Sequence, residues 1–281
     1  MAQILDGKAV AKELREKLAI EIGESGLHPT LAVVYDPNDG GSKLYVGMKQ
    51  RAAAKVGIKT QDIAVPAGST TEAVQQIVRE LNLDPDVTGI LIQAPLPAGV
   101  DDAKVFATVA PEKDVDGLGV TNQGRLFAKE EGQYPVAATP KGVMTLLAHY
   151  GIDPVGKRAV VVGRSQLFGR PMAALLLNAD ATVTIAHRYT DEATLTAALQ
   201  QADIVAVGVG IPGFITVDQI KEGAVVVDVG MNVVDGKAVG DVDPLVEEKA
   251  GWLTPVPGGV GPMTIATLLE STFEAAKEQA K

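Results

Sequence analysis

The stretch VVVGRSQLFGR, residues 160–170, decides how the fold of this chain is interpreted. An apolar run leads into Gly163, and a second glycine, Gly169, precedes Pro171, a favourable residue for the first turn of a helix. A strand, a glycine turn and a helix in this order are typical of nucleotide-binding sheets, because the helix N-terminus presents free N–H groups to a phosphate. The spacing differs from G-x-G-x-x-G, so spacing alone leaves open a cofactor site or a plain strand–turn–helix.

The end of the next strand favours a cofactor site. In NAD-specific sheets, an acidic residue about 20 positions after the glycine turn commonly binds the ribose. Here the next apolar run ends in His187 and Arg188, and Arg188 stands 25 positions after Gly163. A guanidinium suits the 2′-phosphate of NADP, and Arg164 in the glycine turn adds a second positive charge. A solvated arginine at a strand end is the plainer alternative, but two arginines at the two expected places favour NADP.

Further glycines end the later strands of this region. Gly208 and Gly210 follow one apolar run, and Gly230 and Met231 follow another. Ligands of doubly wound sheets lie beyond the carboxyl ends of the strands, where glycine lets the backbone approach closely. Asp228 lies inside the second run and is interpreted as a structural carboxylate that local N–H groups satisfy.

The whole chain alternates apolar strand patterns with helical segments, which predicts βαβ units and parallel sheets. A polar stretch from about 111 to 139 separates two such regions, so we expect an α/β fold of two lobes around a cleft. The second lobe is expected to be a Rossmann-type doubly wound parallel sheet. The predicted domains are residues 1–139 with 262–281, and residues 140–261. The clearest helices of the first lobe are expected at 7–25, 43–56, 71–81 and 262–280, and its strands at 30–36 and 88–93.

Composition limits the classes of function. The chain has 281 residues, 46% of them hydrophobic and 21% charged, which is typical of a soluble globular protein of two domains. No apolar run approaches the ~20 residues of a membrane helix and no secretory signal is recognised, so a cytoplasmic location is expected. The net charge of -10 argues against a nucleic-acid or membrane partner. With no cysteine and three scattered histidines, neither a thiolate nucleophile nor a protein metal site is expected.

The first lobe carries a candidate for proton transfer. Tyr45 and Lys49 are four residues apart, which places them on one face of a helix. A surface tyrosine beside a solvated lysine is the plainer interpretation. Gln93 argues for chemistry, because it ends a buried strand, where a polar side chain needs a hydrogen-bonding purpose. Pro95 and Pro97 stop the strand there, so Gln93 is expected to face the cleft.

Two loops complete the set of candidates. In PEKDVDG, Asp116 fits a generic turn, but beside a cleft its carboxylate would accept hydrogen bonds from an amino-heterocycle. The loop TPVPGGVGPMT brackets glycines with prolines, which indicates a defined backbone close to a ligand.

Taken together, these motifs closely resemble the bifunctional methylenetetrahydrofolate dehydrogenase/cyclohydrolase family. The matching segments, in the order of the family, are YVGMK, GILIQAPLP, PEKDVDG, TPKGV, VVGRS…GRP, DVGMN, GDVDP and TPVPGGVGPMT. The resemblance implies a folate-binding catalytic lobe, an NADP-binding lobe and a homodimer formed through the NADP-binding lobes. It also implies oxidation of 5,10-methylenetetrahydrofolate with NADP, followed by hydrolysis of the methenyl cation to 10-formyltetrahydrofolate.

The resemblance also assigns roles to residues. Lys49 matches the family's catalytic lysine, Gln93 would orient it, Tyr45 would contact the folate, and Asp116 would pair with the pterin. The residues implied to line the folate and nicotinamide site are Pro257, Gly258, Gly259, Val260, Gly261, Pro262 and Thr264. The residues implied to bind the cofactor are Gly163, Arg164, Ser165, Arg188, Gly208, Gly210 and Met231.

Three positions depart from the family pattern. Ala138 replaces a frequent cysteine, Ala94 replaces a leucine after the strand glutamine, and Arg188 replaces the serine that contacts the 2′-phosphate. We expect NADP recognition to be kept. A dehydrogenase without cyclohydrolase activity and a non-catalytic NADP sensor are the alternatives, and the retention of Tyr45, Lys49 and Gln93 argues against both.

Overall fold

The computed structural model describes residues 1–281, which form two compact units. One unit contains residues 1–12 and 139–264, and the other contains residues 13–138 and 265–281. Both are α/β units with parallel sheets, so the predicted fold class is confirmed. None of the helices is long and apolar enough to cross a membrane.

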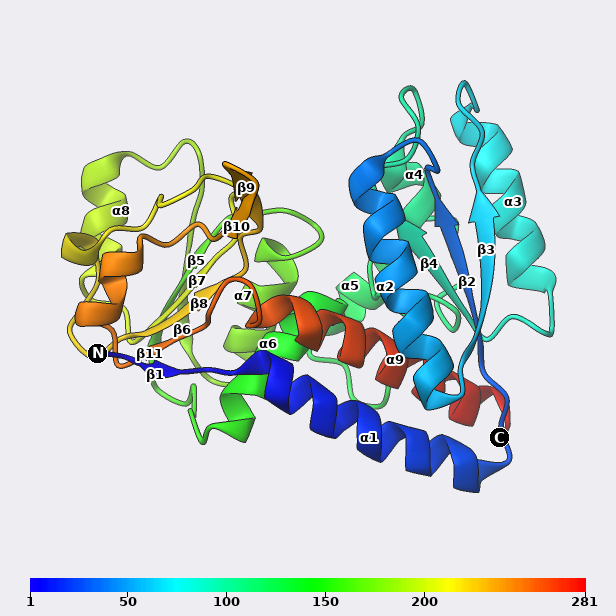
Figure 1. The fold of residues 1–281 in the computed structure, drawn as a ribbon, viewed down its shortest axis with the longest axis horizontal. Helices are drawn as coiled ribbons and strands as arrows, with labels where there is room; N and C mark the ends of the chain where they lie inside the picture. The colour runs from blue at the N-terminus through cyan, green and yellow to red at the C-terminus, as the bar shows by residue number, and fades with distance from the viewer. The chain divides into compact units, whose positions relative to one another are not determined.

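The smaller sheet, in the unit of residues 13–138 and 265–281, has the strand order β3-β2-β4 with all strands parallel (Figure 1). Leu31 and Val33 of the central strand face one core cluster, which includes side chains of α2 and α9. Ala32 and Val34 face a second cluster, which includes side chains of α3 and α4. Burial on both faces explains the continuous apolar strand patterns. The elements are β2 (Thr30–Tyr35), α2 (Gly40–Val56), β3 (Lys59–Ala64), α3 (Thr71–Leu83), β4 (Gly89–Gln93), α4 (Asp102–Phe106) and α5 (Val120–Phe127), together with most of α1 (Gly7–Ser25) and α9 (Val260–Gln279).

The larger sheet, in the other unit, has six parallel strands in the order β1-β11-β8-β7-β5-β6 (Figure 1). The chain passes from β5 outward to β6 and then returns to β7 on the other side of β5. The carboxyl ends of β5 and β7 therefore lie at a topological switch point. The elements are β1 (Gln3–Ile4), α6 (Ala138–His149), β5 (Arg158–Val162), α7 (Gly169–Asn178), β6 (Thr182–Ala186), α8 (Glu192–Leu199), β7 (Ile204–Val207), η1 (Val217–Gln219), β8 (Val225–Asp228), β9 (Asn232–Val234), β10 (Lys237–Val239), η2 (Pro244–Glu248) and β11 (Trp252–Leu253).

The first residues of the chain differ from the expected division into domains. The sequence placed them in the catalytic lobe, whereas residues 1–12 belong to the unit of the larger sheet. Gln3 and Ile4 form β1, which pairs with β11, and the side chain of Leu5 is fully buried. A strand of two residues is too short to show a periodic pattern, so the sequence could not reveal it.

The polar stretch of residues 111–139, for which the sequence analysis predicted no helix, contains the helix α5. Leu126 of this helix is buried, and the amide of Asn122 donates to Asp114 and to the carbonyl of Pro111. The helix has few apolar residues, and one of its buried residues, Asn122, is polar, so its sequence lacks the apolar periodicity that predicts a helix.

The glycine turn after β5 is held by close backbone contact. Gly163 has a φ of 129°, and a Cβ atom on Gly169 would lie 2.2 Å from the carbonyl oxygen of Gly163. Both glycines are therefore required for α7 to begin against the turn.

The substitution Gly169→Ala is expected to lower the free energy of unfolding by about 1–3 kcal/mol, because the added methyl group meets backbone atoms. Gly124→Ala is the matched control, since Gly124 is helical and a Cβ there meets no atom within 4 Å. Urea unfolding of both variants measures the difference. Equal stability of the two variants would contradict the close contact at Gly169.

Candidate active site

A buried lysine is the central feature of the unit with the smaller sheet. Lys49 lies on α2 with only 8% of its surface exposed, and its Nζ donates to Oε1 of Gln93 over 2.7 Å. Gln93 ends β4, and its Nε2 donates to the carbonyl of Ala94. The helix is fixed by Asp39, whose side chain caps its first turn, and it ends at Gly57 in a left-handed conformation. The solvated lysine of the plainer interpretation is therefore not what the structure contains.

Asp116 influences Lys49 electrostatically. Burial lowers the pKa of Lys49, and the negative charge of Asp116 partly offsets that effect. Burial raises the pKa of the Asp116 carboxyl, because it disfavours the charged form. The charge of Lys49 and the hydrogen bond from the backbone N–H of Ala138 lower that pKa. The structure thus brings Lys49, Gln93 and Asp116 together, and Tyr45 lies one helical turn from Lys49 with its side chain half-buried.

The turn that carries Asp116 depends on a carboxylate that the sequence did not single out. Asp114 is buried and accepts hydrogen bonds from the backbone N–H groups of Leu118 and Gly119 and from the side chain of Asn122. Burial raises its pKa to about 6 despite these bonds. The motif KDVDG was interpreted through its second aspartate, whereas the first one builds the turn.

The unit with the larger sheet contains an open pocket of about 1170 Å³ at the carboxyl ends of β5, β6 and β7. This is where a doubly wound sheet binds its ligand. Gly210 and Met231 were predicted to bind the cofactor but do not line the pocket. The predicted residues that do line it are Gly163, Arg164, Ser165, Arg188 and Gly208. Lining residues that the sequence did not single out include Thr190, Leu195, Ile211, Phe214 and Thr216.

The long loop after Gly163 is a closed turn. The side chain of Ser165 accepts the backbone N–H of Phe168, and its carbonyl accepts the N–H of Arg170. The ring of Phe168 is buried, and a Cβ atom on Gly208 would lie 2.8 Å from it. The loop therefore buries its own aromatic side chain against the next glycine turn, which accounts for its extra length.

A buried carboxylate holds the loop after β7. Asp241 is completely buried, and its Oδ2 accepts the backbone N–H groups of Val209 and Gly210 over 2.6 and 2.9 Å. Its Oδ1 accepts the side-chain amide of Asn232 over 2.8 Å. Gly210 thus directs its N–H toward Asp241. The sequence offered Asp241 only as part of the motif GDVDP.

Asp228 binds the backbone of the loops after β8 and β10. Its carboxylate accepts the backbone N–H groups of Gly230, Asp241 and Val242, so the structural role inferred from the sequence agrees with these bonds. Burial raises the pKa of Asp228 to about 6, and the charge of Asp241 adds to that rise. A Cβ atom on Gly240 would lie 1.8 Å from Asp228, so a glycine is needed for the close approach.

The loop TPVPGGVGPMT belongs to the unit of the larger sheet. The N–H of Gly259 donates to the carbonyl of Pro255, and the carbonyl of Gly258, at a φ of 113°, accepts the N–H of Lys8. The hydroxyl of Thr264 lies 3.0 Å from that of Thr139. The predicted lining residues Pro257, Gly258, Gly259, Gly261, Pro262 and Thr264 are therefore in one unit, whereas Lys49, Gln93 and Asp116 are in the other.

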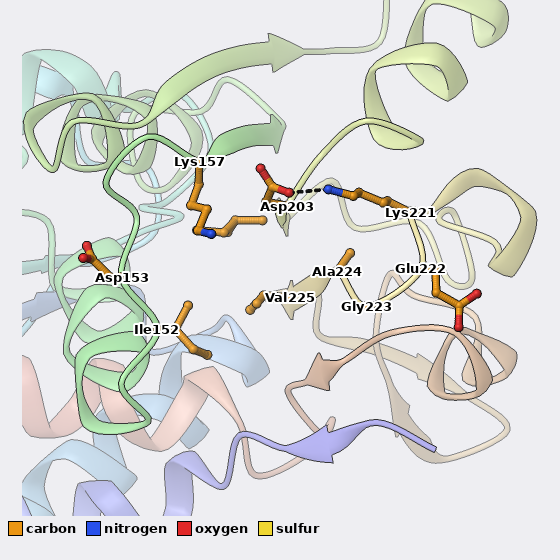
Figure 2. Close-up of a pocket in the computed structure, with 10 residues that line it drawn as sticks. Ile152, Asp153, Lys157, Asp203, Lys221, Glu222, Gly223, Ala224 and Val225 are labelled. Carbon is orange, nitrogen blue, oxygen red and sulfur yellow. Dashed lines mark hydrogen bonds and ion pairs between the residues drawn. The ribbon is translucent and has the colours of Figure 1, made fainter.

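A second pocket of about 160 Å³ lies at the amino ends of β7 and β8 (Figure 2). Two of its charged residues, Lys221 and Asp203, form an ion pair, and Asp203 also accepts the N–H of Arg158. The pocket is too small for a dinucleotide and lies at the end of the strands opposite to the larger pocket. No cluster of three or more His, Asp or Glu residues is placed to hold a metal ion.

The doubly wound sheet, its pocket at the switch point and the buried lysine–glutamine pair define an enzyme with a nucleotide-binding unit. Residues 5–116 match the family "Tetrahydrofolate dehydrogenase/cyclohydrolase, catalytic domain", and residues 137–280 match its "NAD(P)-binding domain". The chain belongs to the tetrahydrofolate dehydrogenase/cyclohydrolase family. It is accordingly a bifunctional dehydrogenase and cyclohydrolase with an NAD(P)-binding domain, as the sequence motifs predicted.

Individual relatives span the whole chain. "Bifunctional protein FolD" of Leuconostoc mesenteroides is 61% identical over 279 residues, with 99% of each chain covered. The crystal structure of the bifunctional enzyme FolD from Campylobacter jejuni is 40% identical, with a TM-score of 0.95 and 99% of each chain covered. The Trypanosoma brucei dehydrogenase-cyclohydrolase, solved with NADP cofactor and inhibitor, is 36% identical, with a TM-score of 0.93 over 100% of this chain and 99% of its own.

The raised pKa of Asp228 predicts a pH dependence of stability. The folded protein binds this proton more tightly than the unfolded chain, so the stabilisation is present at low pH and is lost as the pH rises through about 6. From about pH 5.5 to about pH 7, Asp228 is expected to remove close to 1 kcal/mol from the free energy of unfolding. In Asp228→Asn, the free energy of unfolding should fall less between these two pH values, by about that amount.

Asp235→Asn is the control, because Asp235 lies in the exposed turn between β9 and β10. Denaturant unfolding at the two pH values measures both variants. The same slope in Asp228→Asn as in the unsubstituted protein would exclude Asp228 as the titrating group.

Proposed function

We propose that this chain oxidises 5,10-methylenetetrahydrofolate with NADP as hydride acceptor and then hydrolyses the methenyl cation to 10-formyltetrahydrofolate. The observation that carries the proposal is the buried Lys49, whose Nζ donates to Gln93 over 2.7 Å. A buried lysine whose pKa is lowered by desolvation suits proton transfer to and from water near a cationic substrate. The product would supply one-carbon units for purine and amino-acid synthesis.

The pocket at the switch point has the features that a dinucleotide phosphate requires. Gly163 and Gly169 remove the side chains that would fill the turn, and α7 begins directly behind it. Neither Arg164 nor Arg188 is paired with a carboxylate, so two positive charges remain for a phosphate. Leu195, among the apolar lining residues, would pack against a base. When bound there, the nicotinamide supplies the hydride acceptor.

The residues of this chain have little chemistry to perform in the oxidation. Hydride passes from the methylene carbon without a protein acid or base, so the requirement is contact between the reacting rings. Asp116 would fix the pterin by accepting hydrogen bonds from its amino and ring N–H groups. Tyr45 would contact the folate from the side of α2 that carries Lys49. Gly258 and Thr264, with the rest of the loop 257–264, would line the folate and nicotinamide.

Lys49 would carry the protons of the hydrolysis. Water adds to the methenyl carbon and loses a proton to the neutral amine of Lys49. As the bond from that carbon to N5 breaks, N5 takes a proton from the Lys49 ammonium. The carbinol hydroxyl loses its remaining proton to solvent, which leaves the formyl group on N10 and releases one proton overall. Burial favours the neutral amine, and Gln93 accepts a hydrogen bond from Nζ and so fixes its orientation.

The assembly and location are part of the proposal. The family resemblance supports a homodimer formed through the NADP-binding unit and a cytoplasmic location. Equilibrium sedimentation of the full chain measures the assembly directly.

The proposed activity is tested by mixing the protein with 5,10-methylenetetrahydrofolate and NADP. Reduced cofactor and methenyl product are followed by their absorbance. Lys49→Met is expected to slow hydrolysis of methenyltetrahydrofolate by about 100-fold or more while cofactor reduction falls much less, because only hydrolysis needs the amine.

Lys55→Met is the control, since Lys55 is exposed in the last turn of the same helix. Equal losses of both activities in Lys49→Met would make Lys49 a binding residue. The absence of cofactor reduction by the unsubstituted protein, with either NADP or NAD, would refute the dehydrogenase assignment.

The preference for NADP is tested by Arg188→Ala. Loss of the guanidinium is expected to raise the KM for NADP by about 10-fold or more, equivalent to at least about 1.4 kcal/mol, and to change the KM for NAD little. Arg158→Ala is the control, because Arg158 binds Gln201 at the opposite end of β5. An unchanged ratio of the two KM values would exclude a phosphate-binding role for Arg188.

A further inference from the structure

Two arginines that line the larger pocket, Arg164 and Arg188, both contact the ring of Tyr189, which is not itself a lining residue. Tyr189 follows Arg188 in the turn after β6, and Arg188 Nη2 donates to the Tyr189 hydroxyl over 3.0 Å. The Cζ atom of Arg188 lies 4.9 Å from the centroid of the tyrosine ring. The Cζ atom of Arg164, from the turn after β5, lies 5.5 Å from the same centroid. One ring therefore contacts the guanidinium groups of two separate turns.

The turn itself fixes the position of the ring. The backbone N–H of His187 donates to the hydroxyl of Thr190, and the N–H of Thr190 donates to the carbonyl of His187. The N–H of Tyr189 donates to Nδ1 of His187 over 3.3 Å. The side chain of Tyr189 nevertheless stays 71% exposed, so it contributes nothing to the hydrophobic core.

The contacts of Tyr189 offset an unfavourable interaction. Two guanidinium groups close to one point repel each other, and the negative face of an aromatic ring attracts each of them. The tyrosine oxygen accepts from Arg188, which leaves its own O–H proton free to donate to another acceptor. The cluster therefore presents two cations and a hydroxyl donor, the groups that a phosphate dianion binds.

We propose that Tyr189 is a specificity-determining residue of the cofactor site. Its ring holds Arg164 and Arg188 together as one dianion-binding pair, and its hydroxyl donates to the 2′-phosphate that distinguishes NADP from NAD. The inference rests on the proposed use of NADP. It assigns Tyr189 a role that the sequence did not suggest, beside the Arg188 that departs from the family pattern.

Adenosine 2′,5′-bisphosphate and adenosine 5′-monophosphate are the probes, because they differ only in the 2′-phosphate. Calorimetric titration gives the dissociation constant of each with the full chain. Tyr189→Leu is expected to weaken the bisphosphate by about 10-fold, because the two arginines lose their shared partner. The monophosphate should change by less than about twofold. Tyr189→Phe keeps the ring and loses only the hydroxyl, so its affinity for the bisphosphate is expected to lie between those of the unsubstituted protein and Tyr189→Leu.

Phe127→Leu is the control, because it removes a ring that is 75% exposed in the other unit. Circular dichroism melting establishes that each variant is folded. Equal weakening of both probes by Tyr189→Leu would overturn the inference, because the ring would then be a stacking surface for adenine. Unchanged affinity for both probes would also overturn it. If the unsubstituted protein fails to prefer the bisphosphate, the proposed use of NADP fails first, which is a distinguishable result.

Discussion

The burial of the Lys49 amine is the feature on which the proposed chemistry of the unit with the smaller sheet depends. Lys49 is removed from water by the packing of α2 against the sheet, and Gln93 at the end of β4 supplies the acceptor for its Nζ. Desolvation lowers the pKa of the lysine, and Asp116 limits the decrease. The turn that places Asp116 relies in turn on the buried carboxylate of Asp114. Reactivity here follows from burial together with two specific polar partners.

The unit with the larger sheet has a different requirement, which is open space at the carboxyl ends of its strands. Gly163 and Gly208 line the pocket, and both allow contacts that a side chain would prevent. Asp241 and Asp228 lie beneath the loops and hold their backbone N–H groups. The buried carboxylates thus set the shape of the loops, and Arg164 and Arg188 are the groups that we propose to recognise a phosphate.

Strong periodic patterns let the sequence predict the fold class and most elements. The apolar runs 30–36 and 88–93 became strands buried on both faces. Local patterns could not reveal β1, because its two residues gain their structure from pairing with β11 far along the chain. At the site, the spacing of Tyr45 and Lys49 was visible, but the burial of Lys49 depends on α2 packing against a sheet. Asp241 was missed because its partners, Val209 and Gly210, lie some thirty positions earlier.

The desolvation of the Lys49 amine within the folded protein can be measured directly. Nuclear magnetic resonance of lysine labelled at the side chain measures its pKa directly, and the Lys49→Met variant assigns the signal. We expect a pKa for Lys49 below the ordinary value of 10.5, and a lower value still in Asp116→Asn, because that substitution removes the charge that raises it. A pKa of 10.5 or above, unchanged in Asp116→Asn, would show that the amine is not desolvated and that Asp116 does not act on it.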